Sequence, residues 1–148
     1  MPPKKKDDKK GDDDEVRGEV GVFYNADGSK YDGQYSKKQS ADGNSIVKRH
    51  GFGVFTDGGT VYDGQWVDDA MHGEGTITFD TGASYSGMFF QDVFNGRGTY
   101  KWPDGSSYEG QWRHNKMHGE GVYIDASGRR WTGKFYDNEG VDLIQEVA

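Results

Sequence analysis

Apolar and polar residues alternate with a period of two in many short stretches of this chain. One kind of stretch reads aromatic-x-Gly-x-aromatic, and a second kind begins with Gly-x-Gly. This alternation places every second side chain on the same face of a β-strand, and the stretches are too short for helices. Both kinds are therefore predicted to be strands. The aromatic copies are Tyr31–Tyr35, Tyr62–Trp66, Tyr85–Phe89, Tyr108–Trp112 and Trp131–Phe135, and the Gly-x-Gly copies begin at Gly51, Gly73, Gly96 and Gly119.

The two kinds of strand recur with a fixed period. The aromatic strand that starts at Tyr62 and its three later copies are spaced by 23 residues. The sequence Met-His-Gly-Glu-Gly starts at Met71 and again at Met117, two periods later. A period of this length is typical of a repeat architecture. Tyr31 lies 31 residues before Tyr62, so residues 36–48 are interpreted as an inserted loop of basic composition.

Turn-forming residues join each Gly-x-Gly strand to the next aromatic strand. In Pro103-Asp104-Gly105, proline presets φ for the first turn position and glycine accepts the positive φ that closes the hairpin. The pattern therefore predicts an all-β chain of about five hairpins, or about ten short antiparallel strands. Each central glycine shares a face with two rings, and we expect it to let a neighbouring ring lie over the backbone. The other turns are Asp27-Gly28, Asp57-Gly58, Thr81-Gly82 and Ser127-Gly128, and the central glycines are Gly33, Gly64, Gly87, Gly110 and Gly133.

Composition favours a core made of rings. Of the 148 residues 32% are hydrophobic and Leu143 is the single leucine, whereas there are 9 Tyr, 8 Phe and 4 Trp. Helix bundles and doubly wound folds need aliphatic volume that this chain lacks. The net charge of -7 argues against a general nucleic-acid-binding or anionic-membrane surface. The absence of cysteine and of an apolar N-terminal segment favours a soluble, intracellular protein.

The two ends of the chain depart from the repeat. Residues 1–15 form a mixed-charge run without an aromatic residue, and we expect them to be disordered because they cannot bury enough surface to offset their ordering entropy. The repeat domain is assigned to residues 16–135. Residues 136–148 lack the Gly-x-Gly pattern and are expected to be a C-terminal cap or tail. Within this end, residues 141–147 are compatible with a strand or with a helical turn.

The combined motif resembles the MORN repeat (membrane occupation and recognition nexus). Tyr-x-Gly-x-Trp, then His-Gly-x-Gly, then a turn of the Asp-Gly-Ser type recur between Gly21 and Phe135. The first unit lacks the His-Gly pair, Asn95-Gly96 replaces it in a later unit, and the pattern stops after Phe135. The resemblance implies an elongated, single-layer antiparallel sheet of stacked hairpins, bent into a groove that the Tyr, Trp and Phe rings line.

The repeated histidines and carboxylates raise the question of metal, phosphate or catalytic chemistry. His72 and His118 lie two units apart, or roughly 19 Å at ~4.8 Å per strand, so one ion cannot bind both. The Gly-x-Gly stretches lack the lysine and the following helix of a phosphate loop. The carboxylates Asp68 and Asp69 are expected at a solvated linker tip, and the imidazoles are expected to bond to linker backbone. We therefore predict no catalytic residue, no metal site, no cofactor and no enzymatic activity.

A single-layer sheet leaves a ring-bearing face uncovered, and exposed aromatic surface usually marks an interaction site. The expected function is a non-catalytic scaffold that binds other proteins in its aromatic groove and binds no nucleic acid. The resemblance to short MORN proteins implies a component of the ciliary or flagellar axoneme, or of another cytoskeletal assembly in the cytoplasm. The alternatives are a peripheral module on phosphoinositide membranes and a regulatory adaptor for a separate enzyme. The residues predicted to bind the partner are Tyr62, Trp66, Tyr85, Phe89, Tyr108, Trp112, Trp131 and Phe135.

Overall fold

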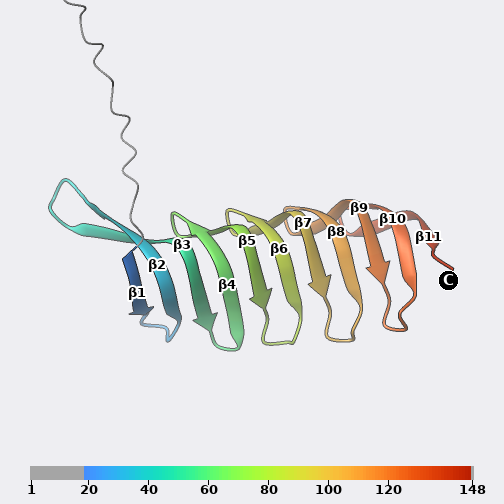
Figure 1. Ribbon diagram of the computed structural model, residues 1–148, viewed down its shortest axis with the longest axis horizontal. Helices are drawn as coiled ribbons and strands as arrows, with labels where there is room; N and C mark the ends of the chain where they lie inside the picture. The colour runs from blue at the N-terminus through green and yellow to red at the C-terminus, as the bar shows by residue number, and fades with distance from the viewer. Residues whose placement is uncertain (1–18, 148) are drawn as a thin grey trace, which may run out of the picture.

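The computed structural model describes residues 19–147, which form one antiparallel sheet of eleven strands. Each strand pairs with its neighbours in the sequence, so the order in the sheet is the order in the chain (Figure 1). The predicted all-β architecture of stacked hairpins in a single open sheet is confirmed. Residues 1–15, for which we expected disorder, lie outside the described residues. The strands are β1 (Glu19–Tyr24), β2 (Lys30–Gln39), β3 (Ser45–Asp57), β4 (Thr60–Val67), β5 (Ala70–Thr78), β6 (Ser84–Phe90), β7 (Val93–Lys101), β8 (Ser107–Arg113), β9 (Lys116–Ile124), β10 (Arg130–Tyr136) and β11 (Glu139–Gln145).

Two kinds of turn alternate on the two sides of the sheet. On one side lie the predicted glycine turns; in one of them the backbone N–H of Trp102 donates to the carbonyl of Ser106 (2.9 Å) and Gly105 has a φ of 88°. On the other side, from β4 onward, two-residue turns join each even-numbered strand to the next strand. Both central residues of these turns have positive φ, for example Asp68 (46°) and Asp69 (70°). This conformation is a type I′ turn, whose twist matches that of paired antiparallel strands.

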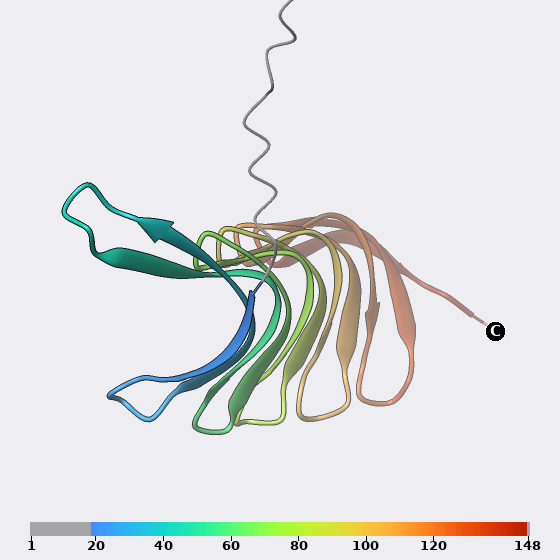
Figure 2. The ribbon, with the colours of Figure 1, turned by 60° about the vertical axis from the view of Figure 1, so that its left-hand side comes forward.

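Each hairpin bends at a pair of glycines, and the bends together give the sheet the shape of a trough (Figure 2). Gly64 of β4 lies opposite Gly75 of β5, and a Cβ on Gly64 would lie 2.5 Å from the Cα of Gly75. Beyond this pair the register is irregular, because a bulge places more residues of β5 than of β4 opposite Gln65. The side-chain Oε1 of Gln65 accepts a hydrogen bond from the backbone N–H of Glu74 (2.8 Å). Bulges of this kind increase the local bend and twist. The same pairing recurs at Gly33 and Gly53, Gly87 and Gly98, and Gly110 and Gly121.

The structure corrects which glycine accommodates a ring. We expected the ring over the central glycine of the aromatic strand, but that glycine faces the backbone of its glycine partner. The ring lies over the partner instead: a Cβ on Gly75 would lie 2.4 Å from the Oη of Tyr62 and 2.6 Å from its ring carbons. Both glycines of a pair are therefore needed, because one allows the backbones to approach and the other leaves room for the ring.

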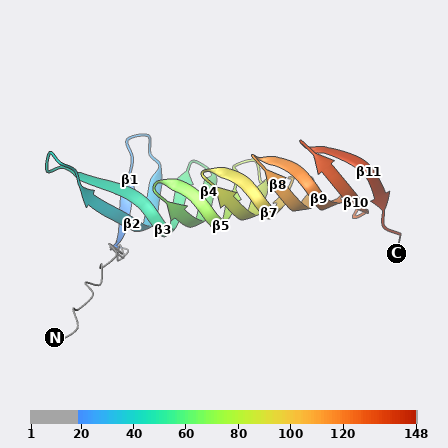
Figure 3. The same ribbon diagram turned by 90° about the horizontal axis from the view of Figure 1, so that it is seen from above.

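Residues 36–48, expected to be a loop, instead form a β-hairpin that prolongs β2 and β3. The strand pairing continues as far as Gln39 opposite Ser45, and Asp42 closes the turn by accepting the backbone N–H of Asn44 (3.0 Å). The loop prediction is wrong because the insertion adds residues to both members of an antiparallel pair, which can simply continue their ladder. We call residues 36–48 the arm; it projects beyond the array at its N-terminal end (Figures 1 and 3).

The C-terminal segment forms a strand, β11, rather than a helical turn. β11 pairs with β10 through an irregular register, and Leu143 packs against the aromatic core. A Cβ on Gly133 would lie 2.7 Å from the Cδ2 of Leu143. This leucine therefore covers the central glycine of the last aromatic strand.

Candidate interaction surface

The tyrosine that begins each of the first four aromatic strands is held from two sides on the inner face of the trough. The ring of Tyr62 lies over Gly75, and its hydroxyl donates to the carbonyl of Gln65 (2.7 Å). A buried hydroxyl usually needs such a partner, because an unpaired one would lose its bond to water without replacement. The equivalent bonds join Tyr31 to Gln34 (2.5 Å), Tyr85 to Met88 (2.8 Å) and Tyr108 to Gln111 (2.9 Å).

The last ring of each aromatic strand connects successive units. Trp66 lies edge-on between Tyr31 of the preceding unit and Tyr62 of its own unit, with ring centroids 5.5 and 5.0 Å apart. Its Nε1 also donates to the carbonyl of Gly53 (3.1 Å). Edge-to-face pairs of this kind contribute about 0.5–1.5 kcal/mol beyond the area they bury. The contacts continue along the sheet as one chain of rings, here called the aromatic ladder: Tyr31, Trp66, Tyr62, Phe89, Tyr85, Trp112, Tyr108 and Phe135.

The structure places most of the predicted partner-binding residues inside this ladder. Seven of the eight have exposed fractions between 0% and 6%, and Trp131 alone is half-buried. A partner cannot gain much contact with side chains that are already enclosed, so the seven rings are core residues in this conformation. The prediction that these seven rings form the docking surface themselves therefore does not fit this conformation. The seven residues are Tyr62, Trp66, Tyr85, Phe89, Tyr108, Trp112 and Phe135.

Burial of the tyrosines predicts a steep loss of stability in alkali. Burial raises the pKa of Tyr31 and of Tyr108 to about 12, and it raises the pKa of Tyr62 and Tyr85 further. The folded chain therefore holds these protons more tightly than the unfolded chain, in which tyrosine has a pKa of about 10. Their stabilising contribution should be complete below about pH 10 and should be lost as the pH rises towards about 12.

An alkaline titration followed by circular dichroism and by tyrosinate absorbance checks this prediction. We expect these four tyrosines to ionise together with the loss of the β-sheet signal. Their ionisation with an unchanged circular dichroism spectrum would show that the hydroxyls are not enclosed.

A second row of rings lies nearer the mouth of the trough and remains half-buried. Five of these rings come from the Gly-x-Gly strands and the residues that follow them, and the sixth, Trp131, begins the last aromatic strand. Several neighbours are in contact: the centroids of Tyr100 and Trp102 are 4.9 Å apart, and those of Trp102 and Tyr123 are 6.0 Å apart. The sequence contains the signal of five of them, because they occupy the second and fourth positions after the Gly-x-Gly motif, whereas Trp131 is the first ring of an aromatic strand. We call this row the rim: Phe55, Phe79, Tyr100, Trp102, Tyr123 and Trp131.

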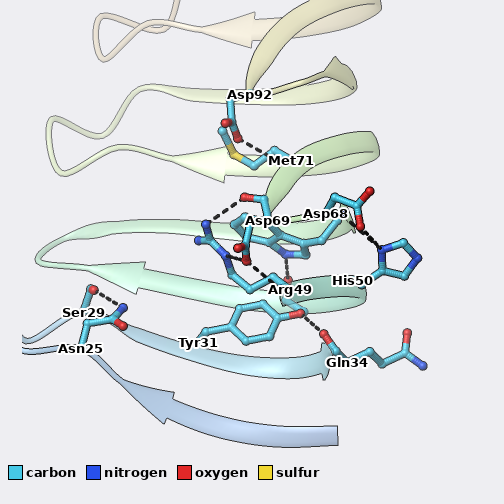
Figure 4. Close-up of polar contacts among 12 residues, drawn as sticks. Asn25, Ser29, Tyr31, Gln34, Arg49, His50, Asp68, Asp69, Met71 and Asp92 are labelled. Atoms are coloured by element: carbon cyan, nitrogen blue, oxygen red, sulfur yellow. Dashed lines mark hydrogen bonds and ion pairs between the residues drawn. The ribbon is translucent and has the colours of Figure 1, made fainter. Parts of the chain in front are cut away.

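An arginine covers the rings where the array begins. The Arg49 guanidinium lies 4.2 Å from the ring centre of Trp66 and 5.2 Å from that of Phe55. Its Nε also lies 3.3 Å from the carboxylate of Asp69, as Figure 4 shows. A guanidinium over a ring face is favourable by about 0.5–1 kcal/mol where the cation remains partly exposed, as Arg49 does here. This end of the trough therefore presents both charge and apolar surface, whereas the rim beyond Phe79 is mainly aromatic.

The type I′ turns hold neighbouring units together through pairs of hydrogen bonds, one between backbone groups and one from a backbone N–H to a side-chain oxygen. The backbone N–H of Asp92 donates to the carbonyl of Met71 (3.0 Å), and the Asp92 carboxylate accepts the N–H of Met71 (2.9 Å; Figure 4). The same reciprocal pair joins Asp69 to Arg49. The expectation that Asp69 is merely a solvated charge is therefore wrong, because its side chain bonds to Arg49 of the preceding unit. The remaining pairs are Asn115 with Phe94 and Asn138 with Met117.

The repeated histidines contact the first residue of the same turns. The Nδ1 of His50 accepts the backbone N–H of Asp68 (3.2 Å), and the Nδ1 of His72 accepts that of Gln91 (3.5 Å). The predicted bond from imidazole to linker backbone is confirmed at His72, and His50 makes the same bond, but the prediction is wrong at His118. His118 differs, since its Nδ1 lies 3.6 Å from the carboxylate of Asp137. Within residues 19–147, no three His, Asp or Glu side chains gather where a metal ion could bind.

Comparison with known structures gives a distant match. The chain aligns with the TCP domain of SAS-4 (dCPAP) of Drosophila melanogaster, solved in complex with a proline-rich motif of Ana2 (dSTIL), at 15% identity and a TM-score of 0.39. The alignment covers 76% of this chain and 63% of that chain, so the chain spans less than two thirds of its length. A likeness of this size carries no functional argument. No curated protein sequence matches the chain.

The repeat itself gives a direct match. The sequence profile of the MORN repeat fits residues 48–60, 62–84, 85–107 and 108–129, which together make up more than half of the chain. MORN repeats are non-catalytic, and they generally mediate interactions with proteins or membranes. Among residues 19–147 no helix is long and apolar enough to cross a membrane. By the match of these four segments and by its stacked hairpins, the chain belongs to the MORN-repeat family.

Proposed function

We propose that this protein is a non-catalytic scaffold that holds a segment of another protein in its trough, against the rim. One observation carries the proposal: a row of six half-buried rings runs along the inside of a single-layer sheet, and no other part of residues 19–147 covers it. Aromatic side chains bury large areas at a small cost in conformational entropy, and they dominate the binding energy of protein interfaces. Of the residues predicted to bind the partner, Trp131 is the one that is also part of the rim.

The rest of the trough mouth favours a protein segment over a small ligand. The opening over β3 to β5 is lined by Phe55, Phe79 and Met71, with Arg49 and Asp92 among them. Apolar surface continues from there along the rim for several units, which is longer than a drug-sized molecule needs. A peptide segment can follow such a row and can place alternate side chains on successive rings.

We further propose that the protein works in a cytoskeletal assembly in the cytoplasm, with the axoneme of a cilium or flagellum as the first candidate. The support is the resemblance to short proteins that consist almost wholly of MORN repeats. A tagged copy in a ciliated cell should therefore be found along the axoneme. A diffuse or membrane-bound distribution would contradict this placement.

The rim can be tested with a double variant, Trp102→Ala with Tyr123→Ala. Both side chains are half-buried and end in the trough mouth, so their loss should weaken binding more than folding. We expect recovery of axonemal proteins on the immobilised chain to fall by about ten-fold, which corresponds to roughly 1.4 kcal/mol. Circular dichroism should show an unchanged sheet.

The matched control is Tyr136→Ala, which removes an aromatic ring with an exposed fraction of 51% from the outer face. The control should bind like the unmodified chain. Equal loss in both variants, or undiminished recovery with the double variant, would remove the rim from the proposal. Binding to phosphoinositide vesicles that both variants retain would favour the membrane alternative.

A further inference from the structure

The arm carries cations that the rest of the described structure does not pair. Lys37, Lys38 and Lys48 are exposed, and none makes an ion pair with a residue among 19–147. Across the hairpin, Lys37 faces Val47 and Lys38 faces Ile46, so no carboxylate lies opposite either. The acidic residue of the arm, Asp42, is occupied in the turn, where it accepts bonds from Ser40 and Asn44. The arm is thus a local basic surface on a chain with a net charge of -7.

The arm also offers an open strand edge. Pairing of β3 with β4 begins only at Gly51, and the bonds between Arg49 and Asp69 close the gap at the base of the arm. Beyond that point, residues 45–48 pair with β2 alone among the described residues. Unpaired N–H and C=O groups on such an edge can accept one more extended strand.

Two side chains give this edge apolar contacts as well. Ile46 and Val47 have exposed fractions of 48% and 41%. Because they are adjacent in a strand, they lie on opposite faces of the arm. An added strand with alternating side chains would therefore meet one apolar residue and at least one lysine on each face.

We infer that the arm binds an extended acidic segment of a partner protein, which adds as a strand to residues 45–48 of β3. The three lysines neutralise its carboxylates, and the strand edge supplies the backbone bonds. A second copy of this chain is a poor occupant, since pairing two arms would bring lysines together. A membrane is also a poor occupant, because the tip of the arm, Ser40 to Asn44, is polar and contains Asp42.

Within the described residues, β1 pairs with β2, where Glu19 faces Tyr35, and it therefore leaves the open edge of residues 45–48 unoccupied. This binding surface lies outside the trough and does not depend on the function proposed for the rim.

The test uses the full chain and a short fluorescent peptide in which Glu and Val alternate. Fluorescence anisotropy should show binding that weakens with added salt, because exposed charges are screened over about 10 Å at 0.1 M ionic strength. The triple variant Lys37→Glu, Lys38→Glu and Lys48→Glu should lose at least about ten-fold in affinity, because like charges then face each other. The Trp102→Ala, Tyr123→Ala variant should bind the peptide normally, which separates this site from the rim.

The matched control reverses three exposed lysines elsewhere, Lys101, Lys116 and Lys134, and so changes the net charge equally. It should leave the affinity nearly unchanged. Equal losses in the two triple variants, or no binding of the peptide by the unmodified chain, would overturn the inference. Binding to vesicles of phosphatidylcholine and phosphatidylserine without binding to the peptide would also overturn it.

Discussion

Replacing Gly98 by alanine should destabilise the protein by about 3 kcal/mol or more, because the new methyl group would have to occupy the place of a fixed ring. A Cβ on Gly98 would lie 2.2 Å from the Oη of Tyr85 and 2.4 Å from its Cζ. Tyr85 cannot move aside, since it is fully buried, stacks on Phe94 at 3.8 Å and donates to the carbonyl of Met88. Urea denaturation followed by circular dichroism measures the loss.

The control for this substitution is Gly82→Ala. Gly82 has a φ of 91° but no atom within 4 Å of an added Cβ, so alanine there should cost only the backbone strain of about 1–2 kcal/mol. In a Tyr85→Ala background, the Gly98 substitution should become much less harmful, because the clash is gone. If Gly98→Ala lowered the free energy of unfolding equally in both backgrounds, the ring of Tyr85 would not be the reason that glycine is needed at this position.

Replacing Trp112 by alanine should cost about 3–5 kcal/mol, the usual range for a buried tryptophan. Trp112 has an exposed fraction of 6%, lies edge-on to Tyr85 and Tyr108, and donates from Nε1 to the carbonyl of Gly98 (3.0 Å). Its loss therefore breaks the aromatic ladder between two units and leaves a partly buried carbonyl without its donor. The midpoint of chemical denaturation measures the effect.

Trp102→Ala is the comparison, because it removes the same side chain from the rim. Trp102 is only half-buried, so the expected cost is about 1–2 kcal/mol from the smaller apolar area returned to water. If the two substitutions cost the same, the division into a buried ladder and an accessible rim would be wrong. This comparison also shows whether a rim variant is stable enough for the binding experiment.

The repeat and its strands could be predicted from the sequence because they depend on local, periodic signals. The spacing from Tyr62 to Tyr85, the alternation within each strand and the glycine turns each give the same hairpin assignment. Which rings are buried could not be predicted in this way. Tyr100 and Tyr108 both lie at alternating positions of neighbouring strands, and only the bend at the glycine pairs encloses one and leaves the other half-buried.

Two further features depend on pairing between distant residues, which a periodic pattern does not contain. The role of Asp92 depends on Met71 in another unit, and a two-residue linker with a carboxylate gives no sign of that bond. The arm depends on whether Ser36 to Gln39 meet a partner strand, and a polar composition suggested a loop. At the C-terminal end, by contrast, the loss of the repeat pattern after Phe135 was a sufficient signal for a cap, and Leu143 packs against the last unit there.

The aromatic ladder makes every internal junction of the sheet nearly the same. Each unit of 23 residues receives a ring from the unit that follows it and sends one to the unit before it. A gene duplication or deletion of one unit would thus keep the ring contacts of the ladder at the new junction, and it would change the distance between the arm and β11 by roughly 10 Å. The length of the sheet can therefore change in whole repeat units while the arm and β11 themselves stay the same.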